Sequence, residues 1–546
     1  MRGLSVHPVL AAVLVGRGLR EPSAAERFLN PSLDDLHDPF ALPDMAPAVD
    51  RVVQALEGGE PILVHGDYDA DGVTSTALLV RFLAKLGADV RYFLPHRFED
   101  SYGLSERAVR ASAGEATLII ALDCGVKDHQ AVACACAQDQ DVIVVDHHEP
   151  GDDLPEALVI DPKRGDSDYP ERDLAAVGLA FKLASALCER LELSQRSLQR
   201  AFLDLVAIGT IADVSPLVGE NRVMTAFGLQ LLPHTRKVGL QVLLELCDLT
   251  ERVGARDVAF RIAPRLNAVG RMADATDALE LLLTEDEHQA RRSALHLDAL
   301  NRQRQEEQAS TFREALVMIE AEVDPARDRM VVLARPGWHR GVVGIVASKV
   351  LESTGLPTLL LAIEGEHARG SARSIPAFNI AHALGRCDDL LDRHGGHSLA
   401  AGCELSIDRV DELRSRLGEL ACELIADADL RPQLAVDVEV SPAELDAELA
   451  VALGALEPCG EANPEPRLAV RDLRVRGART VGAAGAHLKL NLEGDGRGFD
   501  AIGFGLGARL GDVPVDARVD LAFTPVIDDY SGLPRLQLQL ADIRPH

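Results

Sequence analysis

Acidic and imidazole side chains that could bind a metal ion gather in one short stretch of the sequence. The apolar run PILV leads into HGDYDADG, where alternate positions are occupied by His65, Asp67, Asp69 and Asp71. Carboxylates so close together would repel one another without a cation, and they are ligands that divalent ions accept. On its own, however, an Asp-rich turn can equally be a solvated loop.

The same pattern recurs further along the chain. TLIIALDCG places Asp123 after an apolar run, and DVIVVDHH ends in Asp146, His147 and His148. In an open α/β sheet the carboxyl ends of the strands line the ligand crevice, so these groups would become neighbours. Because a buried carboxylate cluster is costly unless a cation offsets it, the recurrence favours a metal site over chance.

A further carboxylate, Asp213, follows the apolar run in VAIGTIADVSPL. Taken alone, it could be a helix cap or a turn residue. Taken with the three clusters upstream, it is a candidate for the same site.

Alternating strands and helices are expected to position these groups. Short runs rich in Val and Ile predict strands within 61–66, 88–95, 117–125 and 141–148, and helical stretches lie at 73–87 and 127–138. This alternation predicts an α/β fold with a doubly wound parallel sheet. Gly72 is expected to open the helix 73–87, whose free amides and positive dipole end favour a bound phosphate.

With 546 residues, the chain is too long for one ordinary core. The stretch 285–322 has no Gly or Pro and is rich in helix formers, which predicts a long connecting helix. The last part alternates apolar and polar residues at strand spacing, which is typical of a small β-barrel. The expected parts are an N-terminal helical cap (1–49), a first α/β domain (50–282), a connecting helix (283–326), a second α/β domain (327–430) and a β-barrel (431–546).

Composition limits the classes of function. A net charge of -30 argues against coating nucleic acid by overall positive potential, so any nucleic-acid path must be a local basic channel. Only seven of the 56 basic residues are lysine, so arginine would supply the contacts to phosphate. The nine cysteines lack CxxC spacing and no apolar run reaches about 18 residues, so we expect a cytoplasmic chain without structural zinc or a membrane span.

The ordered motifs HGDYDADG, LDCG, DHHEP and GTIADVSPL resemble those of the DHH phosphoesterase superfamily. The similarity continues through APRLNAVGRM, GWHRGVVGIVASKV, RGSARSI, RHGGHSLAAG and EPCGEANPEP, a set that resembles the RecJ family of nucleases. This resemblance implies a DHH domain, a DHHA1-type accessory domain and an OB-like barrel. It also implies hydrolysis of single-stranded DNA from the 5′ end, in DNA repair and recombination.

The resemblance further implies two divalent metal ions, Mn²⁺ or Mg²⁺, bound by residues at matching motif positions. One ion would be held by His65, Asp69 and Asp123. The other would be held by Asp71, Asp123, His147 and Asp213, with Asp123 as the bridge. His148 would face the scissile phosphate, and Asp67 and Asp146 would support the ligands from outside.

Substrate contacts are expected from glycine-rich motifs that allow close backbone approach. Near the end of the first domain the candidates are Arg265, Asn267 and Arg271, with Arg261 nearby. In the accessory domain, where the resemblance implies a grip on phosphate, they are Arg369, Ser371, Arg373 and His397. In the barrel, the aromatic residues are Phe499, Phe504, Phe523 and Tyr530, and the basic cluster is Arg471, Arg474, Arg476 and Arg479. Trp338 could be a base-stacking platform, but a single tryptophan is more often a core residue.

Three positions depart from the family pattern: Asp161 stands where Asn is usual, and Ala176 and Ala372 where Gly is usual. None of them is an expected metal ligand. The implied partners are single-stranded DNA, a single-strand binding protein and a helicase, with the chain as a monomer and no membrane. Two alternatives stay open: another DHH phosphodiesterase that acts on oligonucleotides or cyclic dinucleotides, and a non-catalytic scaffold that binds single strands.

Overall fold

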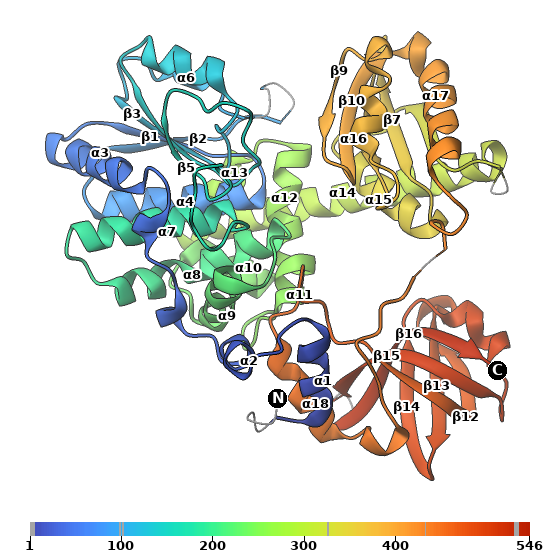
Figure 1. Cartoon of the computed structure of the whole chain (residues 1–546). Coiled ribbons are helices and arrows are strands. Elements are labelled where there is room, and N and C mark those ends of the chain that lie inside the picture. Colours follow the sequence, from blue (N-terminus) through green and yellow to red (C-terminus); the bar gives the residue numbers. More distant parts are fainter. Residues whose placement is uncertain (1–5, 98–99, 101–102, 325–326, 432, 529–533) are drawn as a thin grey trace. The chain divides into compact units, whose positions relative to one another are not determined.

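A parallel sheet of five strands, in the order β2-β1-β3-β4-β5, lies in the first part of the chain (Figure 1). The computed structural model describes residues 6–546 except 98–99, 101–102, 325–326, 432 and 529–533. The strands are β1 (Ile62–His65), β2 (Val90–Phe93), β3 (Leu118–Leu122), β4 (Asp141–Val145) and β5 (Leu158–Ile160). The strand order reverses between β1 and β3, which places a ligand crevice at the carboxyl ends of the strands.

Helices cover both faces of this sheet, as the doubly wound prediction requires. They include α3 (Met45–Gly58), α4 (Ala70–Lys85), α5 (Glu106–Ala111) and α6 (His129–Cys136). Apolar side chains of α5 and α6 share a core with one face of the strands. The predicted α/β fold is therefore confirmed for this part.

The start of α4 differs from the prediction. The helix begins at Ala70 rather than after Gly72, and the Asp69 carboxylate accepts hydrogen bonds from the amides of Asp71 and Gly72. These amides are therefore used by the chain itself and do not offer a phosphate site. A Cβ at Gly72 would lie 2.6 Å from the Asp67 backbone nitrogen, so only glycine lets the loop pack against the helix.

After β5 the chain is helical up to the second sheet. The helices are α7 (Ala176–Arg190), α8 (Gln195–Ala212), α9 (Gly219–Leu231), α10 (Val238–Leu246), α11 (Ala255–Asp257), a π-helix η4 (Val258–Ile262), α12 (Ala263–Met272), α13 (Thr276–Leu283) and α14 (Glu287–Glu322). Helices α4, α7 and α8 pack against one another. The predicted long connecting helix is present as α14.

A second sheet has the order β6-β7-β8-β10-β9, in which only β6 and β7 are parallel. Its strands are β6 (Val331–Pro336), β7 (Thr358–Glu364), β8 (His367–Arg373), β9 (Arg393–Gly396) and β10 (Ala400–Ser406). Its helices are α15 (Val343–Thr354), α16 (Ile380–Gly385) and α17 (Val410–Leu424). This is the predicted α/β accessory domain.

The last part is a closed barrel, because β12 pairs with both β13 and β15. Its strands are β12 (Leu468–Val481), β13 (His487–Gly494), β14 (Arg497–Gly503), β15 (Arg518–Asp528) and β16 (Arg535–Pro545), preceded by β11 (Val438–Glu439) and α18 (Ala447–Leu453). The predicted barrel is confirmed. Unexpectedly, the N-terminal helix α1 (Pro8–Gly16) contributes apolar side chains to the barrel core, and α2 (Pro22–Leu29) follows it.

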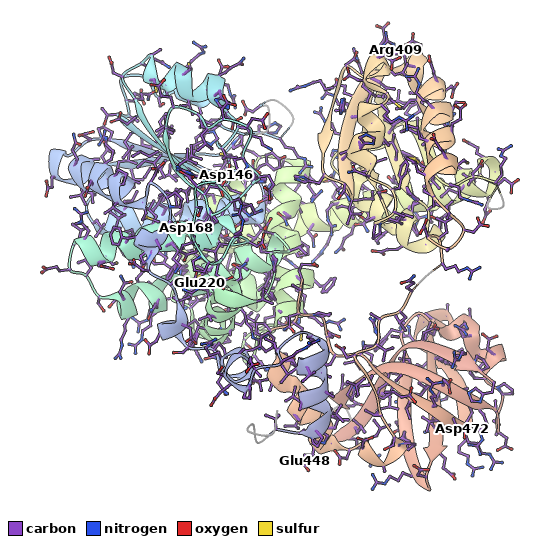
Figure 2. All side chains as sticks on the ribbon, in the orientation of Figure 1. Asp146, Asp168, Glu220, Arg409, Glu448 and Asp472 are labelled. Carbon is purple, nitrogen blue, oxygen red and sulfur yellow. The ribbon has the colours of Figure 1, made fainter. Side chains whose placement is uncertain are left out.

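By internal contacts the chain forms two compact units. One comprises Met1–Ala263, Leu281–Glu287 and Leu434–His546, and the other comprises Pro264–Glu280 and His288–Gln433. Acidic side chains occur in several parts of the chain, for example Asp146 near the first sheet and Asp472 on the barrel (Figure 2). Within the described part of the chain, we find no helix with the length and apolar character needed to span a lipid bilayer.

Candidate metal centre

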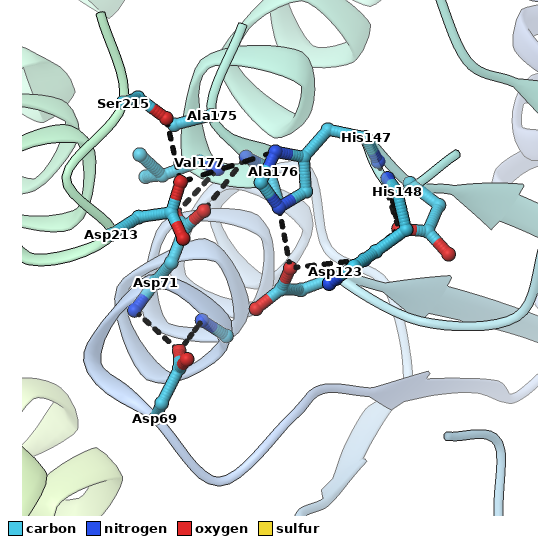
Figure 3. Close-up of polar contacts among 12 residues, drawn as sticks. Asp69, Asp71, Asp123, His147, His148, Ala175, Ala176, Val177, Asp213 and Ser215 are labelled. Carbon is cyan, nitrogen blue, oxygen red and sulfur yellow. Dashed lines mark hydrogen bonds and ion pairs between the residues drawn. The ribbon is translucent and has the colours of Figure 1, made fainter. Parts of the chain in front are cut away.

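Acidic and imidazole side chains from separate segments meet at the carboxyl ends of β1, β3 and β4 (Figure 3). In each of three overlapping groups, one ligand atom per residue lies within 4.8 Å of the others. The groups are Asp67, Asp69 and Asp123; Asp71, His147 and Asp213; and Asp123, His147 and His148. The segments that the sequence analysis linked by pattern are therefore neighbours in space.

Asp71 is fixed by the start of α7. Its two carboxylate oxygens accept hydrogen bonds from the backbone amides of Ala176 (2.8 Å) and Val177 (2.9 Å). Burial, together with the nearby carboxylates of Asp213 and Asp69, raises the pKa of Asp71 well above its ordinary value. The amides hold this carboxylate in place and leave its remaining lone pairs available to a metal ion.

Asp123 lies at the centre of the cluster, directly after β3. Its backbone has a φ of 63°, a conformation that is uncommon for residues other than glycine and that turns the chain at the strand end. The side chain is 3% exposed, and burial together with neighbouring carboxylates raises its pKa well above the ordinary value. A buried carboxylate among carboxylates is costly unless a cation balances the charge.

His147 lies between two carboxylates. Its Nε2 atom is 3.1 Å from Asp123 Oδ1, and its Nδ1 atom is 4.0 Å from Asp213 Oδ2. Burial lowers the pKa of His147, so the neutral ring with an available lone pair is favoured. Asp213 is the C-cap residue of α8 and accepts a hydrogen bond from the Ser215 hydroxyl at 2.6 Å.

Asp146 organises the pair of histidines from behind. Its Oδ1 atom accepts hydrogen bonds from the backbone amides of His147 and His148 and lies 2.7 Å from His148 Nδ1. Burial alone would raise the pKa of Asp146, but His148 and the other hydrogen bonds hold it at about 2. For His148, burial would lower the pKa, but the hydrogen bond and charge of Asp146 raise it. His148 is partly exposed and its protonated form is favoured by Asp146, so it is suited to face a phosphate.

Two atoms in this cluster indicate that the site is built for a cation. Asp67 Oδ1 and His147 Nε2 are buried and make no hydrogen bond within the described part of the chain, although His147 Nε2 lies 3.1 Å from the carboxylate oxygen Oδ1 of Asp123. Both carry lone pairs, and such orphaned acceptors beside crowded carboxylates fit the ligands of a hard divalent ion. No cysteine belongs to the cluster, which also suits Mn²⁺ or Mg²⁺.

His65 is the exception among the expected ligands. It is fully buried, its Nε2 atom accepts the Ser105 amide at 3.2 Å, and its Nδ1 atom lies 3.7 Å from the Cys124 sulfur. Burial lowers its pKa to about 4. The structure groups Asp67, rather than His65, with Asp69 and Asp123, which differs from the expectation that Asp67 is only a supporting residue.

Sequence reasoning missed two features that hold the ligands. One is Ser215, which is visible in the sequence as a hydroxyl two residues after Asp213 but is not distinctive there. The other is the pair of α7 amides that bind Asp71, and backbone groups leave no trace in residue types.

The substrate candidates of the accessory domain are only partly together. Arg373 ends β8 and pairs in register with Ala400, whose carbonyl accepts the amide of His397. A Cβ at Gly344, at the start of α15, would lie 3.3 Å from both Arg373 Nη2 and Ser371 Oγ. These groups therefore share one end of the sheet. Arg369, at the other end of β8, pairs with Glu404 at 2.9 Å.

Several other basic candidates already have partners. Arg265 is 2.8 Å from Asp298, Arg271 donates to the Gly341 carbonyl, and Arg261 lies beside Asp257. In the barrel, ion pairs engage Arg471, Arg474 and Arg476. The barrel pairs are exposed and therefore weak, so phosphate could replace the acidic partner there.

The aromatic candidates fall into three groups. Trp338 is 4% exposed and donates to Glu314, which confirms it as a core residue. Phe499 and Phe523 are also buried, whereas Phe504 is 55% exposed. Tyr530 lies outside the described residues.

Three family models match successive parts of the chain. They describe the DHH family, N-terminal domain (residues 61–210), the DHHA1 domain (327–422) and the RecJ OB domain (436–542). The parallel sheet and most of the acid–imidazole cluster lie in the first of these. Fold and site together define a protein of the DHH class.

Curated relatives narrow this class. The single-stranded-DNA-specific exonuclease RecJ of Bacillus subtilis (strain 168) is 37% identical over 545 residues, which cover 99% of this chain and 68% of the relative. The Escherichia coli (strain K12) protein of the same name is 36% identical, with 98% and 96% covered. The chain therefore belongs to the RecJ family.

Solved structures agree with this assignment. RecJ from Thermus thermophilus in complex with Mn²⁺ superposes with a TM-score of 0.86 at 34% identity, covering 100% of this chain and 77% of that one. The Mg²⁺ complex from the same organism gives a TM-score of 0.80 at 33% identity, with 100% and 76% covered.

Proposed function

We propose that this chain is a metal-dependent exonuclease that hydrolyses single-stranded DNA from its 5′ end, in DNA repair and recombination. The observation that carries the proposal is the buried cluster around Asp123, in which crowded carboxylates and a neutral His147 leave lone pairs without hydrogen-bond partners. RecJ relatives named as single-stranded-DNA-specific exonucleases, and RecJ structures with Mn²⁺ and Mg²⁺, support both the substrate and the metals.

The proposed ligand sets follow the geometry. Asp67, Asp69 and Asp123 would hold one ion, while Asp71, His147 and Asp213 would hold the other, with Asp123 between them. Ions held by these residues would supply Lewis acidity, which would lower the pKa of a bound water and offset the negative charge that develops on the phosphate. Hydrolysis would form a bond from the water oxygen to phosphorus and break the bond to the leaving sugar oxygen. The water loses a proton, the leaving oxygen takes one up, and no protein nucleophile is required.

The residues of the chain have separate roles in this proposal. The α7 amides hold Asp71, Ser215 holds Asp213, and Asp146 orients the His148 ring and favours its protonated form. His148 would donate a hydrogen bond to the scissile phosphate. In the second unit, Ser371, Arg373 and His397 would bind a phosphate of the strand, with lesser contributions from Arg265, Asn267, Arg271 and Arg369.

The proposal also includes features that rest on the family alone. We expect the chain to act as a monomer in the cytoplasm, where a repair nuclease meets the chromosome, with a single-strand binding protein and a helicase as partners. A non-catalytic scaffold is disfavoured, because the acidic and imidazole positions of the cluster are filled.

Digestion of single strands labelled at the 5′ or the 3′ end, with Mn²⁺ supplied or chelated, tests this function. We expect label release from the 5′ end only, loss of activity with chelator, and loss of at least about a thousandfold in Asp123→Ala, since both ions would lose a shared ligand. Glu448→Ala, on a distant exposed side chain of α18, is the control. Digestion that persists without metal, or in Asp123→Ala, would refute the proposal.

A further inference from the structure

The motif EPCGEANPEP has no role in the function described so far, yet its first part contacts the loop that follows Asp213. The 455–463 segment leads from α18 toward the barrel. The amide of Leu217 donates to the Glu461 carbonyl at 2.8 Å. An added Cβ at Gly460 would lie 2.7 Å from Leu217 Cδ1, so the Leu217 side chain packs directly on this glycine.

Arg222, one turn into α9, binds the same segment. Its guanidinium donates to the carbonyls of Leu456 (2.9 Å), Glu457 (2.9 Å) and Pro458 (3.1 Å), and also to Phe28 in the N-terminal region. It is 2% exposed, and burial lowers its pKa to about 10. The cation is thus stabilised by carbonyl dipoles and by the Phe28 ring, whose centroid lies 3.9 Å from the guanidinium carbon, and removal of those carbonyls would leave most of its hydrogen bonds unmade.

The segment itself is kept rigid from inside. The buried Asn463 side chain donates to the carbonyls of Leu456 (2.8 Å) and Pro458 (2.9 Å), and Gly460 pairs with Asn463 through the backbone. Arg17 donates to Asn463 Oδ1 from the other side. The 455–463 segment is therefore a preformed surface on which Leu217 and Arg222 are anchored.

The loop that carries Asp213 needs such an anchor. Val214, the next residue, has a φ of 62° and is 63% exposed, which is a strained conformation for a β-branched side chain that has little packing of its own. Only three residues separate Asp213 from Leu217. A strained turn persists when its surroundings fix it, and here the fixed points are α8 before Asp213 and the 455–463 segment after it.

We propose that the 455–463 segment is a positioning element for Asp213, acting through Leu217 and Arg222. The inference rests on the proposed function, in which Asp213 is a metal ligand. The 455–463 segment, about 250 residues from Asp213 in sequence, would thus have a role at the metal centre. Without its contacts the strained turn at Val214 would relax, and the Asp213 carboxylate would move away from the other ligands. Substitution of a residue that holds a metal ligand in place typically lowers metal affinity by about 10- to 100-fold.

Calorimetric titration of the full metal-free chain with Mn²⁺, without DNA, tests the inference. Gly460→Ala would push Leu217 aside, and Leu217→Ala would remove the contact from the other partner. We expect each variant to weaken one of the two Mn²⁺ binding events by about tenfold and to leave the other unchanged. Because both substitutions break the same contact, the double variant should lose no more than Leu217→Ala alone.

Two controls separate positioning from general destabilisation. Gly454→Ala lies in the same connection, but its Cβ would meet nothing within 4 Å, so both Mn²⁺ affinities should stay as in the unaltered chain. Leu449→Ala truncates a fully buried leucine of α18 and should lower the melting temperature without changing either affinity.

Unchanged Mn²⁺ affinities in both Leu217→Ala and Gly460→Ala would overturn the inference, as would additive losses in the double variant. If Gly460→Ala fails to fold, Leu217→Ala decides the matter alone. Normal Mn²⁺ binding and digestion by the unaltered chain would meanwhile leave the proposed function intact. Absence of Mn²⁺ binding by the unaltered chain would instead overturn the proposed function, and the inference with it.

Discussion

At the scale of residues, the ligand types could be predicted from the sequence, but one choice between neighbours could not. Asp69, Asp71, Asp123, His147 and Asp213 meet as expected. Our proposed ligand set has Asp67 in place of His65, because the Ser105 amide and the Cys124 sulfur lie against the two ring nitrogens of His65. Only the folded chain brings these groups together, so the spacing of HGDYDADG cannot reveal the difference.

Asp161, where the family usually has Asn, gives a prediction about stability. The side chain is fully buried, Oδ2 has no hydrogen-bond partner in the described structure, and burial raises its pKa to about 7 despite the Lys163 amide. The folded pKa thus exceeds the unfolded one, so the ionised carboxylate destabilises the fold as pH rises through this range. Asp161→Asn should therefore stabilise the metal-free chain by up to about 4 kcal/mol at pH 8 and much less at pH 5.

Thermal melts at the two pH values measure this difference. The exposed Asp168→Asn is the control and should show the same small effect at both values. An equal gain at pH 5 and pH 8 for Asp161→Asn would contradict the prediction.

At the scale of elements, apolar runs predicted the strands because β1 and β3 are buried along their whole length. The same reasoning misplaced the start of α4. Asp69 caps this helix and accepts hydrogen bonds from the backbone amides that we expected to bind phosphate. A cap and a ligand draw on the same residue types, so the sequence pattern does not distinguish them.

Strand β8 and its neighbours provide the second prediction. The side chains of Arg373 and Ser371, at the end of β8, lie next to Gly344 at the start of α15, as a phosphate site would require. Arg373→Ala should weaken binding of single-stranded DNA, and the slope of log K against log salt should become shallower by about 0.7 because one phosphate contact is lost. Fluorescence anisotropy at several salt concentrations, in a catalytically inactive background, measures both quantities.

Arg409→Ala is the matched control, because Arg409 is an exposed arginine of the same unit that donates to the Asp389 carbonyl. It should leave the slope unchanged. An Arg373→Ala variant with the same affinity and slope as this control would exclude Arg373 from the phosphate site.

At the scale of the whole molecule, the order of the parts could be predicted, but contacts between distant segments could not. Helix α1 joins the barrel core across more than 400 residues, and Arg222 binds carbonyls of the 455–463 segment. Both contacts depend on shape and on backbone groups, which residue types do not encode. The net charge of -30 likewise gave no sign of the metal site, because acidic residues occur throughout the chain.

The charge of the cluster predicts how metal changes global stability. Ions that bind only the folded chain should stabilise it by about 2.7 kcal/mol at 100 times their dissociation constant, so Mn²⁺ should raise the melting temperature. Asp123→Ala should abolish this rise. In the absence of metal this variant should be at least as stable as the unaltered chain, because it removes a buried carboxylate whose neighbours oppose its ionisation. Sodium chloride at matched ionic strength is the control, and an equal rise in both chains would contradict the account.

Anomalous diffraction from crystals soaked in Mn²⁺ tests most directly whether two divalent ions bind among these carboxylates and His147. Our account predicts two anomalous peaks about 3.5–4 Å apart, on either side of the Asp123 carboxylate. It also predicts that Asp67 and Asp69 face one peak and that Asp71, His147 and Asp213 face the other. Peaks elsewhere in the chain, with none beside Asp123, would contradict it.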